Sequence, residues 1–411
     1  MKRQYLLLLP ILSLMMTMFA CEDYVTSVDP LIDRVEDGKL NNESEVPFVI
    51  VGLDGQFAAT HDELMMIADL LSDQLYFSRK IKGTSYSSYE EIDNGDIPID
   101  NSSTGGPEVD IGRLRLYADD IVERVDKVDF TDNDLRDEAL FKGYLYGGAA
   151  RYYYATYFGL SENEGGGIID GGSFVPSDDM YDLAIEKFEE ALLNTEDAAL
   201  KRTVNSLIAR CYLFQADYTN ASAYAEVGMV AGDDPYQAEH NISDDSNYYY
   251  ASAGNGRRQA GADARFAAYL TADSTEVDRV LVRELLDDEK ANRRDTETYY
   301  TQTKYPVAET GVDLISWQEN ELMLAELDIR GGGTGLTNIN AVRASHGIPD
   351  LASADMSVLI EERDKELCFT GLRLVDQRRF DADYNTWHLD AALWRYLPIS
   401  DEERVTNSNI D

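Results

Sequence analysis

The spacing of apolar residues constrains this chain most, because it follows the period of an α-helix in one long segment after another. Residues 61–77 show the pattern most simply, with apolar side chains three and four positions apart at Leu64, Ile67, Ala68 and Leu71. This spacing gathers the apolar side chains on one face of a helix. The same pattern predicts helices over residues 110–128 and 133–159, and alternating patterns typical of strands are rare. A mainly all-α fold is therefore predicted.

The helix predicted over residues 133–159 contains features that indicate how it packs. Gly143, Gly147 and Gly148 lie in its interior, where each glycine costs about 1 kcal/mol relative to alanine. We therefore expect another element to pack closely against them. The tyrosines between positions 144 and 157 recur at helical spacing with alanines, which predicts that most of them belong to the core.

Helical spacing continues beyond this segment. Ser177 is predicted to cap a helix whose first turn contains Asp178 and Asp179. A hydroxyl can accept hydrogen bonds from the free N–H groups there, and the helix dipole favours acidic side chains. Further helical segments are predicted at residues 200–232, 313–330, 336–347 and 355–380.

Residues 200–232 resemble a tetratricopeptide helix pair, in which small and aromatic residues stand where two helices cross. The resemblance is carried by Ala209, Tyr212, Ala221 and Tyr224. We predict such pairs over about 133–232 and 313–347. The stretch between about 233 and 306 is predicted to form loops and short elements. No linker divides the chain, so residues 48–411 are predicted to form a single domain.

Acidic residues dominate the composition. The chain of 411 residues contains 77 aspartates and glutamates against 36 lysines and arginines, which gives a formal net charge of −41. Such a surface repels phosphate backbones, so nucleic-acid binding is not expected. The acidic residues are spread along the whole sequence, which predicts a solvated acidic surface of the kind that a saline habitat favours.

Residues 1–20 are typical of a secretory signal. Two basic residues precede an uncharged, mostly apolar run that ends directly before Cys21. The run is shorter than the roughly 20 apolar residues that span a bilayer, and Pro10 interrupts it. A cysteine at this place resembles the lipidated first residue of bacterial lipoproteins, so Cys21 is predicted to carry acyl chains that hold the protein on a membrane. The alternative is a secreted protein with a free Cys21.

Residues 21–47 are polar, with few periodic apolar positions, and are predicted to form an extended arm behind the anchor. The other two cysteines, Cys211 and Cys368, lie among apolar residues at helical spacing. This setting predicts two buried thiols, and a disulfide between them is the alternative.

Four segments near the end of the chain carry a more specific resemblance. They are ELMLAEL at 321–327, INAVRASHGIPDL at 339–351, IEERDKELCFTGLRLVDQRRF at 360–380 and LPISDEE at 397–403. In this order, and together with Asn407 and Asn409, they resemble the closing segments of the RagB/SusD family. The stretch CEDYVTSVDP and the helix ending in ARYYYATYFG are similar to that family as well. Lys365 and Thr370 depart from the pattern, since arginine and glutamate are common at these two places.

The resemblance implies both a fold and a function. The fold is a SusD-like helical domain with loop-rich insertions. Members of the family are surface-exposed outer-membrane lipoproteins that bind a nutrient, most often a glycan, and act as a lid over a SusC-like TonB-dependent barrel. They are not enzymes. The resemblance thus implies that Cys21 is the membrane tether, that an oligosaccharide is the ligand and that the barrel is the protein partner.

No arrangement typical of an enzyme occurs in the sequence. The four histidines are scattered, and zinc, P-loop and nucleophile-elbow motifs are missing. Glu361 and Glu362 form an acidic pair of the kind that glycoside hydrolysis needs, but nearby arginines such as Arg363 favour structural ion pairs. Residues 93–101 gather oxygen ligands that could hold calcium, but they lack the spacing of a known calcium loop, so a solvated loop is expected. Neither catalytic residues nor a cofactor nor a metal site is predicted.

A sugar site needs exposed aromatic side chains beside polar ones, because sugars have flat apolar faces edged with hydroxyls. Such a cluster is predicted at Tyr248, Tyr249, Tyr250, Asn255 and Arg257. A second one is predicted at Tyr76, Tyr86 and Tyr89. Three consecutive aromatics in a non-periodic polar segment are hard to bury together, which favours exposure. The alternative is that these tyrosines pack back onto the helices.

Two other functions stay open at this point. A lipid-anchored tetratricopeptide-like scaffold would bind proteins or peptides, and a SusD-like lid could import peptides in place of glycans. A glycosidase that uses an acidic pair is the remaining enzyme alternative. Retention of the purified protein by polysaccharides or by peptides would separate the binding functions.

Overall fold

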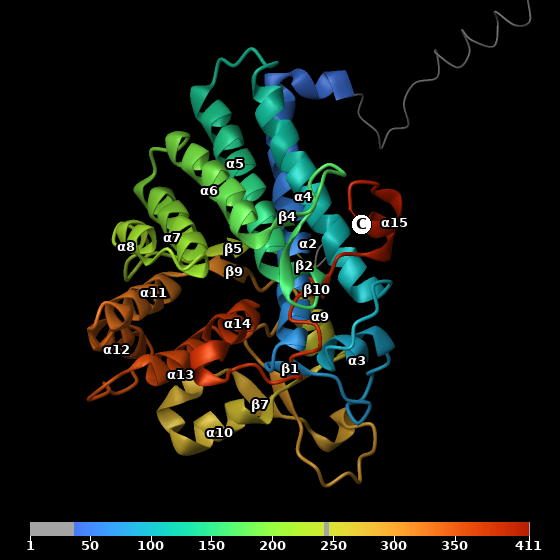
Figure 1. Ribbon diagram of the computed structural model, residues 1–411, viewed down its shortest axis with the longest axis vertical. Coiled ribbons are helices and arrows are strands. Elements are labelled where there is room, and N and C mark those ends of the chain that lie inside the picture. The colour runs from blue at the N-terminus through green and yellow to red at the C-terminus, as the bar shows by residue number, and fades with distance from the viewer. Residues whose placement is uncertain (1–36, 242–245, 411) are drawn as a thin grey trace, which may run out of the picture.

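The computed structural model describes residues 37–241 and 246–410. The predicted signal segment 1–20, the lipidation site Cys21 and the first part of the predicted arm lie outside the described residues. Helices dominate the described chain, and short strands connect them (Figure 1). Within these residues, no helix combines the length and the hydropathy needed to cross a membrane.

A layer of successive helices makes up the first half of the chain. It consists of α2 (Val46–Leu71), α4 (Ser102–Val125), α5 (Asn133–Tyr157), α6 (Ser177–Leu193), α7 (Ala198–Phe214) and α8 (Tyr218–Ala225). Helix α5 packs between α4 and α6, α7 packs on α6, and α8 packs on α7. Figure 1 shows α5 to α8 following one another along one side of the molecule. The helix predicted to begin at position 133 is confirmed as α5.

Two of the three glycines in α5 let neighbouring helices approach closely. A Cβ at Gly143 would lie 2.7 Å from Cγ2 of Ile121 in α4, and a Cβ at Gly148 would lie 2.6 Å from the ring of Phe188 in α6. Gly147 has more room, because the nearest atom would be 3.5 Å away. The predicted close packing is therefore confirmed at Gly143 and Gly148. Most tyrosines of α5 are buried, as the sequence predicts.

The last third of the chain continues the helical layer. It contains α11 (Trp317–Arg330), α12 (Leu336–Ser345), α13 (Met356–Glu366), α14 (Leu372–Tyr384) and α15 (Asp401–Thr406). Helix α11 packs on α8, α12 and α13, and α14 packs on α2. The helix predicted over residues 355–380 is divided in two. The cause is a turn in which Phe369 and Gly371 have left-handed backbone, with φ of 57° and 75°.

Three small sheets hold the loops against the helices. Their strands are β1 (Leu75–Tyr76), β2 (Phe158–Ser161), β3 (Glu164–Gly167), β4 (Val175–Pro176), β5 (Tyr236–Ala238), β6 (Gly261–Ala262), β7 (Val282–Glu284), β8 (Tyr300–Gln302), β9 (Val312–Ile315) and β10 (Leu397–Pro398). The strand orders are β1-β6-β8-β7, β10-β2-β3-β4 and β5-β9. Strand β10 runs parallel to β2, which fixes the end of the chain beside the end of α5.

Shorter helices lie in the loops between these elements. They are α3 (Ser87–Asp93), α9 (Tyr248–Ala253) and α10 (Ala264–Ala272), with the 3₁₀ helices η3 (Ser274–Asp278) and η4 (Asp287–Glu289). Together with β5 to β8, the elements α9, α10, η3 and η4 occupy the stretch that the sequence predicts to contain loops and short elements. Strand β1 and helix α3 extend this loop-rich region from a distant part of the sequence.

The end of the predicted arm is folded and not extended. Residues 37–45 form two 3₁₀ helices, η1 (Asp37–Asn41) and η2 (Glu43–Glu45). The carboxylate of Glu43 accepts hydrogen bonds from the backbone N–H groups of Thr131 and Asp132, at 3.0 and 2.7 Å. Because these contacts tie the segment to the turn before α5, residues 37–45 pack as part of the helical domain.

Two helices begin earlier than their apolar pattern predicts. Helix α2 starts at Val46 and α4 starts at Ser102, whereas the sequence predicts starts at positions 61 and 110. In the added turns of α2, Ile50, Leu53 and Phe57 are buried and extend the apolar face of the helix toward its N-terminus, although Phe48 and Val51 are 70% and 67% exposed. In α4 the added turns begin with a cap, because the side chain of Asn101 accepts a hydrogen bond from the next turn.

Ser177 begins α6 but does not cap it. Its hydroxyl donates a hydrogen bond to the carbonyl of Ala155 at 2.7 Å, and the N-cap position is occupied by Pro176. Asp178 and Asp179 lie in the first turn, as predicted. The serine therefore joins α6 to α5 and leaves the N–H groups of the first turn without a side-chain cap.

The two cysteines of the described chain are buried free thiols, which confirms the prediction. Burial raises the pKa of Cys211 to about 12 and that of Cys368 to about 11. Both thiols therefore stay protonated at neutral pH and act as small apolar side chains.

The turn that divides α13 from α14 depends on a glycine. A Cβ at Gly371 would lie 2.5 Å from the sulfur of Met65 in α2, and φ is +75°. Gly332 also has a positive φ, of +95°, but a Cβ there would meet nothing within 4 Å. A comparison of alanine substitutions at Gly371 and Gly332 therefore separates the free-energy cost of the left-handed backbone from the cost of the contact with Met65.

We predict that Gly371→Ala destabilises the fold more than Gly332→Ala does. The left-handed backbone costs a residue with a Cβ about 1–2 kcal/mol, and crowding against α2 adds about 1–3 kcal/mol at Gly371 alone. The midpoints of urea unfolding measure both effects. Equal midpoints for the two variants would contradict the proposed contact.

A buried carboxyl joins α2 to two distant segments. Asp69 is 0% exposed, and its carboxyl accepts hydrogen bonds from the Tyr249 hydroxyl at 2.5 Å and from the Gly371 backbone N–H at 3.1 Å. Burial raises the pKa of Asp69 to about 7. The folded protein therefore holds a proton on this side chain at pH values where the unfolded chain has lost it.

We predict that Asp69 makes stability fall as the pH rises. The unfolded chain loses the proton near pH 4, at about the ordinary pKa of aspartate, and the folded protein loses it near pH 7. Between these values the folded state binds more protons, so stability falls by up to about 1.4 kcal/mol per pH unit. Relative to Asp69→Asn, the wild type should lose free energy of unfolding between about pH 5 and 7. A difference that stays constant with pH would contradict the shifted pKa.

Candidate functional site

The structure brings the two predicted aromatic clusters together. Strand β1 pairs antiparallel with β6, so that Tyr76 lies opposite Gly261. The amide oxygen of Gln259 accepts hydrogen bonds from the backbone N–H groups of Ser85 and Tyr86, at 2.9 and 3.2 Å. Its amide nitrogen donates to a carbonyl of the same loop at 3.1 Å. This buried side chain fixes Tyr86 beside the turn that follows α9. Figure 1 shows β1, α3 and α9 in the lower half of the molecule, above α10.

Tyr86 and Arg257 form an exposed pair at this place. Tyr86 is 39% exposed, and the guanidinium carbon of Arg257 lies 5.3 Å from the centroid of its ring. The guanidinium also donates a hydrogen bond to the hydroxyl of Ser85 at 2.9 Å. A cation–π contact at an exposed site contributes about 0.5–1 kcal/mol. The pair therefore presents an aromatic ring and N–H donors next to each other on the surface.

Three other predicted residues lie around this pair. Asn255 is exposed, and its amide oxygen accepts a long hydrogen bond of 3.4 Å from Arg283. Tyr76 and Tyr250 are half-buried. The accessible part of the predicted site consists of Tyr86, Asn255 and Arg257, with parts of Tyr76 and Tyr250.

Tyr89 and Tyr249 are buried, so the prediction that they are exposed is wrong. The ring of Tyr249 stacks on Tyr305 at a centroid distance of 4.7 Å, and its hydroxyl donates to Asp69. The hydroxyls of Tyr89 and Tyr248 lie 2.7 Å apart, and Tyr248 is half-buried. The physical reason is that α9 is a helix, in which neighbouring tyrosines face different ways. Polar partners inside the protein also satisfy the hydroxyls of the buried rings.

Two residues that support this region were not predicted from the sequence. Gln259 positions the loop that carries Tyr86, as described above. Glu63 on α2 is half-buried and hydrogen-bonds the hydroxyl of Tyr248. Burial raises the pKa of Glu63 to about 7, and the charge of Asp110 adds to the shift. A signal for Glu63 exists in the sequence, because the run HDELMMIAD places several acidic residues in an otherwise apolar helix.

The acidic pair considered for glycoside hydrolysis belongs to structural ion pairs. Glu362 is 3% exposed and contacts Arg279 and Arg343 at 2.8 and 2.9 Å. Glu361 pairs with Lys365 at 2.6 Å. The predicted structural role is confirmed, but the partners differ from those expected, because Arg363 pairs with Asp376 at 2.7 Å. Because Glu362 is enclosed by guanidinium groups, it has no open side from which to act on a sugar.

The oxygen-rich stretch 93–101 is tied to the segment that follows β1. Asp93 is half-buried, and one of its carboxylate oxygens accepts a hydrogen bond from the backbone N–H of Phe77 at 3.1 Å. Burial raises the pKa of Asp93 to about 7. Across the described ranges, no group of three or more His, Cys, Asp or Glu side chains is placed to hold a metal ion.

Solved structures share the arrangement of this chain. A SusD superfamily protein from Bacteroides vulgatus aligns with a TM-score of 0.72 and 16% sequence identity, over 90% of this chain and 98% of that protein. A laminarin-binding SusD-like protein aligns with a TM-score of 0.65 and 14% identity, over 90% and 98%. Surface glycan-binding protein A from Bacteroides thetaiotaomicron, solved with laminarihexaose, aligns with a TM-score of 0.67 and 13% identity, again over 90% and 98%.

The likeness to these structures establishes the fold. It covers nearly the whole length of each of them, while the sequence identity is low. No protein-family model matches the sequence, and no curated protein does. The mainly α-helical, SusD-like fold that the sequence predicts is therefore confirmed.

We predict that Tyr86 and Tyr249 respond differently to substitution. Tyr249→Ala removes a buried ring and leaves Asp69 without its hydroxyl partner, so it should cost about 3–5 kcal/mol of stability. Tyr86→Ala removes a partly exposed ring and should cost less than about 1 kcal/mol. Thermal unfolding followed by circular dichroism measures both. A Tyr249→Ala variant as stable as the wild type would contradict the buried position of this ring.

Proposed function

We propose that this protein is a glycan-binding lipoprotein of the outer membrane. The exposed pair of Tyr86 and Arg257 carries the proposal, because a ring beside N–H donors is the combination that a sugar needs. The SusD-like fold supports it, since two of the structures that share this fold are a laminarin-binding protein and a glycan-binding protein in complex with laminarihexaose.

The chemistry of binding follows from the accessible side chains. The apolar face of a sugar ring packs on Tyr86, and its hydroxyls accept hydrogen bonds from Arg257. The amide of Asn255 both donates and accepts at the margin of the same surface. Tyr248 and Tyr249 are positioning residues, because they hold the loop surface from beneath and do not reach the ligand.

The ligand leaves the protein chemically unchanged. The acidic pair at Glu361 and Glu362 is occupied by ion pairs, and the side chains proposed to meet the sugar, those of Tyr86, Asn255 and Arg257, include none of the carboxylates that glycoside hydrolysis uses. The protein therefore captures an oligosaccharide and releases it intact. Incubation with laminari-oligosaccharides should yield no shorter products by chromatography.

Membrane attachment and a partner complete the proposal. Acyl chains on Cys21 hold the protein on the outer surface of the outer membrane, each buried methylene contributing about 0.8 kcal/mol. A SusC-like TonB-dependent barrel receives the captured ligand. Affinity capture from gently solubilised outer membranes tests this partnership. A barrel recovered in near-equal amounts supports delivery to a transporter, whereas recovery of soluble proteins alone favours a scaffold.

We predict that Tyr86→Ala and Arg257→Ala each weaken glycan binding by about tenfold, which corresponds to about 1.4 kcal/mol. The measurement is isothermal titration with a panel of glycans that begins with laminarihexaose. The chain offers a matched control in Tyr218, which is 36% exposed and lies 4.6 Å from the guanidinium carbon of Arg330. Tyr218→Ala should leave binding unchanged.

Two results would contradict the proposed site. One is glycan binding that survives Tyr86→Ala and Arg257→Ala in folded protein. The other is an equal loss of affinity in Tyr218→Ala, which would show that any exposed tyrosine–arginine pair has the same effect. If the protein binds peptides but none of the glycans in the panel, the ligand is a peptide and not a glycan.

A further inference from the structure

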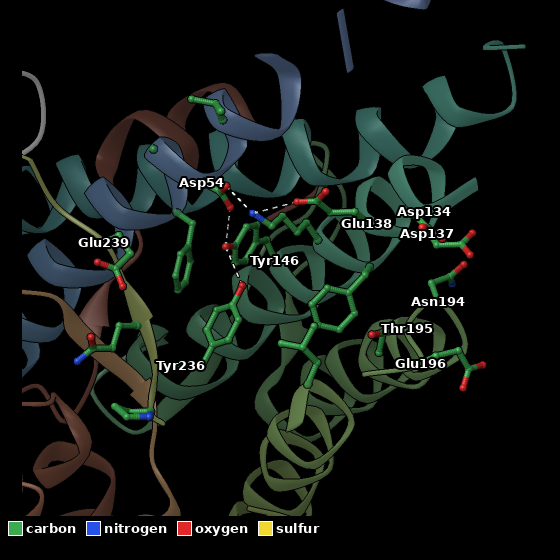
Figure 2. Close-up of a pocket in the computed structure, with 18 of the residues that line it drawn as sticks. Asp54, Asp134, Asp137, Glu138, Tyr146, Asn194, Thr195, Glu196, Tyr236 and Glu239 are labelled. Carbon is green, nitrogen blue, oxygen red and sulfur yellow. Dashed lines mark hydrogen bonds and ion pairs between the residues drawn. The ribbon is translucent and has the colours of Figure 1, made fainter. Parts of the chain in front are cut away.

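A cavity of about 850 Å³ lies on another part of the molecule, between α2, α5, the turn from α6 to α7, and β5 (Figure 2). On α2 its wall contains Val51 and Asp54. The lining shares no residue with Tyr86, Asn255 and Arg257, and Phe57, its nearest member to Glu63 on α2, lies about 9 Å from Glu63 along the helix at a rise of 1.5 Å per residue. The cavity is therefore separate from the proposed glycan site.

The floor of the cavity is a rigid aromatic stack. Phe57 and Tyr146 lie face to face, with ring centroids 4.4 Å apart and an interplanar angle of 14°. The hydroxyl of Tyr146 donates to the carboxylate of Asp54 at 2.8 Å and lies 2.9 Å from the hydroxyl of Tyr236. Because Phe57 and Tyr146 are only 1% and 3% exposed, their faces are not free to stack on a sugar.

The walls carry far more negative than positive charge. The lining carboxylates are Asp54, Asp134, Asp137, Glu138, Glu196 and Glu239, and the lining cation of the described cavity is Lys142. The ammonium of Lys142 contacts Asp54 at 2.6 Å and Glu138 at 3.9 Å. Figure 2 shows Glu239 on one side of the cavity and Asp134, Asp137 and Glu196 on the other. Asp137 and Glu196 also pair with Arg136 and Lys201, at 2.7 and 2.9 Å, but neither of these cations lines the cavity. The lining itself therefore offers a net negative charge to a ligand.

Aliphatic side chains line the same space. Val51 and Leu193 are 67% and 75% exposed, and Leu200 and Pro235 complete the aliphatic part of the lining. Aliphatic surface of this kind packs against a chain of methylene groups and gives a hydroxyl-rich ligand nothing to bond. The cavity thus combines methylene-binding walls with separated negative charges.

We propose that this cavity binds an alkylammonium chain, that is, a ligand with several primary amines joined by methylene groups. The methylenes pack on Val51 and Leu193, and the ammonium groups meet the carboxylates on the two sides. Two sources share this chemistry, a free polyamine and the lysine side chains of a basic peptide. The volume of the cavity suits either ligand, since sites for small molecules enclose about 300–1,000 Å³.

The test uses spermine and tetralysine as probes, with full-length protein purified in detergent. Titration calorimetry should show saturable binding of one molecule per chain, and tetralysine acetylated on its side chains should not bind. The tighter of the two probes identifies the source of the ligand. If neither probe binds saturably, or if the acetylated peptide binds as well as tetralysine, the proposal is overturned.

Charge-matched variants separate this cavity from the general acidity of the surface. The triple variant Asp134→Asn, Glu138→Gln, Glu239→Gln should weaken binding by at least about tenfold. The control triple variant Asp178→Asn, Asp179→Asn, Glu186→Gln removes the same charge from the exposed face of α6, outside the cavity, and should bind as the wild type does. Equal losses in the two variants would show non-specific attraction and overturn the proposal.

Removal of a positive charge from the cavity gives a second test, with the opposite expected effect on binding. Lys142→Gln removes the lysine that occupies Asp54 and Glu138, so binding of the amine probe should become several times tighter. Weaker binding in a folded Lys142→Gln variant would place the ligand elsewhere. Tyr86→Ala should leave binding of the amine probes unchanged. A result that contradicts the proposed glycan site can therefore be distinguished from one that contradicts the proposed cavity.

Discussion

Helix α2 carries His61, Asp62 and Asp69 into the core, and the rest of the structure depends on the partners that these buried groups need. A polar group taken from water without a hydrogen bond costs a folded protein about 1–3 kcal/mol. His61 lies within hydrogen-bond distance of the Tyr153 hydroxyl and the Asp313 carbonyl, at 2.8 and 3.0 Å, and burial lowers its pKa to about 3. A neutral ring with both nitrogens bonded thus ties α2 to α5 and to β9.

The same constraint shapes the candidate glycan surface. Asp62 accepts a hydrogen bond from the backbone N–H of Tyr248 at 2.5 Å, and Asp69 accepts one from the hydroxyl of Tyr249 at 2.5 Å. These bonds dock the short helix α9 on α2 and draw its aromatic rings inward. What stays outside is the turn after α9, and Gln259 binds that turn to the loop from β1. The exposure of Tyr86 and Arg257 therefore follows from the buried hydrogen bonds that Asp62 and Asp69 make with α9.

The sequence predicts the long helices well because their patterns are local. Helix α5 ends within two residues of its predicted end, since its glycines, alanines and tyrosines all follow one period. The burial of each tyrosine, in contrast, depends on residues that are distant in the sequence. Tyr249 is buried because it meets Asp69, which lies 180 positions away in the chain. Tyr86 and Tyr89 are three residues apart, yet Tyr89 is buried, whereas Tyr86 is exposed and has its backbone held by Gln259, 173 positions away. The cavity beside α2 is assembled from four separated segments and has no signature in any of them.

The acidity of the chain is not uniform over its surface, and its distribution distinguishes the two sites. In the loop-rich region, Arg257 lies over the exposed ring of Tyr86 and Arg283 donates to Asn255, so N–H donors face a neutral ligand rich in hydroxyls. Beside the N-terminal half of α2, six lining carboxylates face a single lysine, and this arrangement repels anions and attracts amines. Because α2 is one continuous helix held by buried hydrogen bonds, both ends keep a fixed separation. The proposed glycan site and the proposed amine cavity share no side chain, so that a ligand in one would not compete with a ligand in the other.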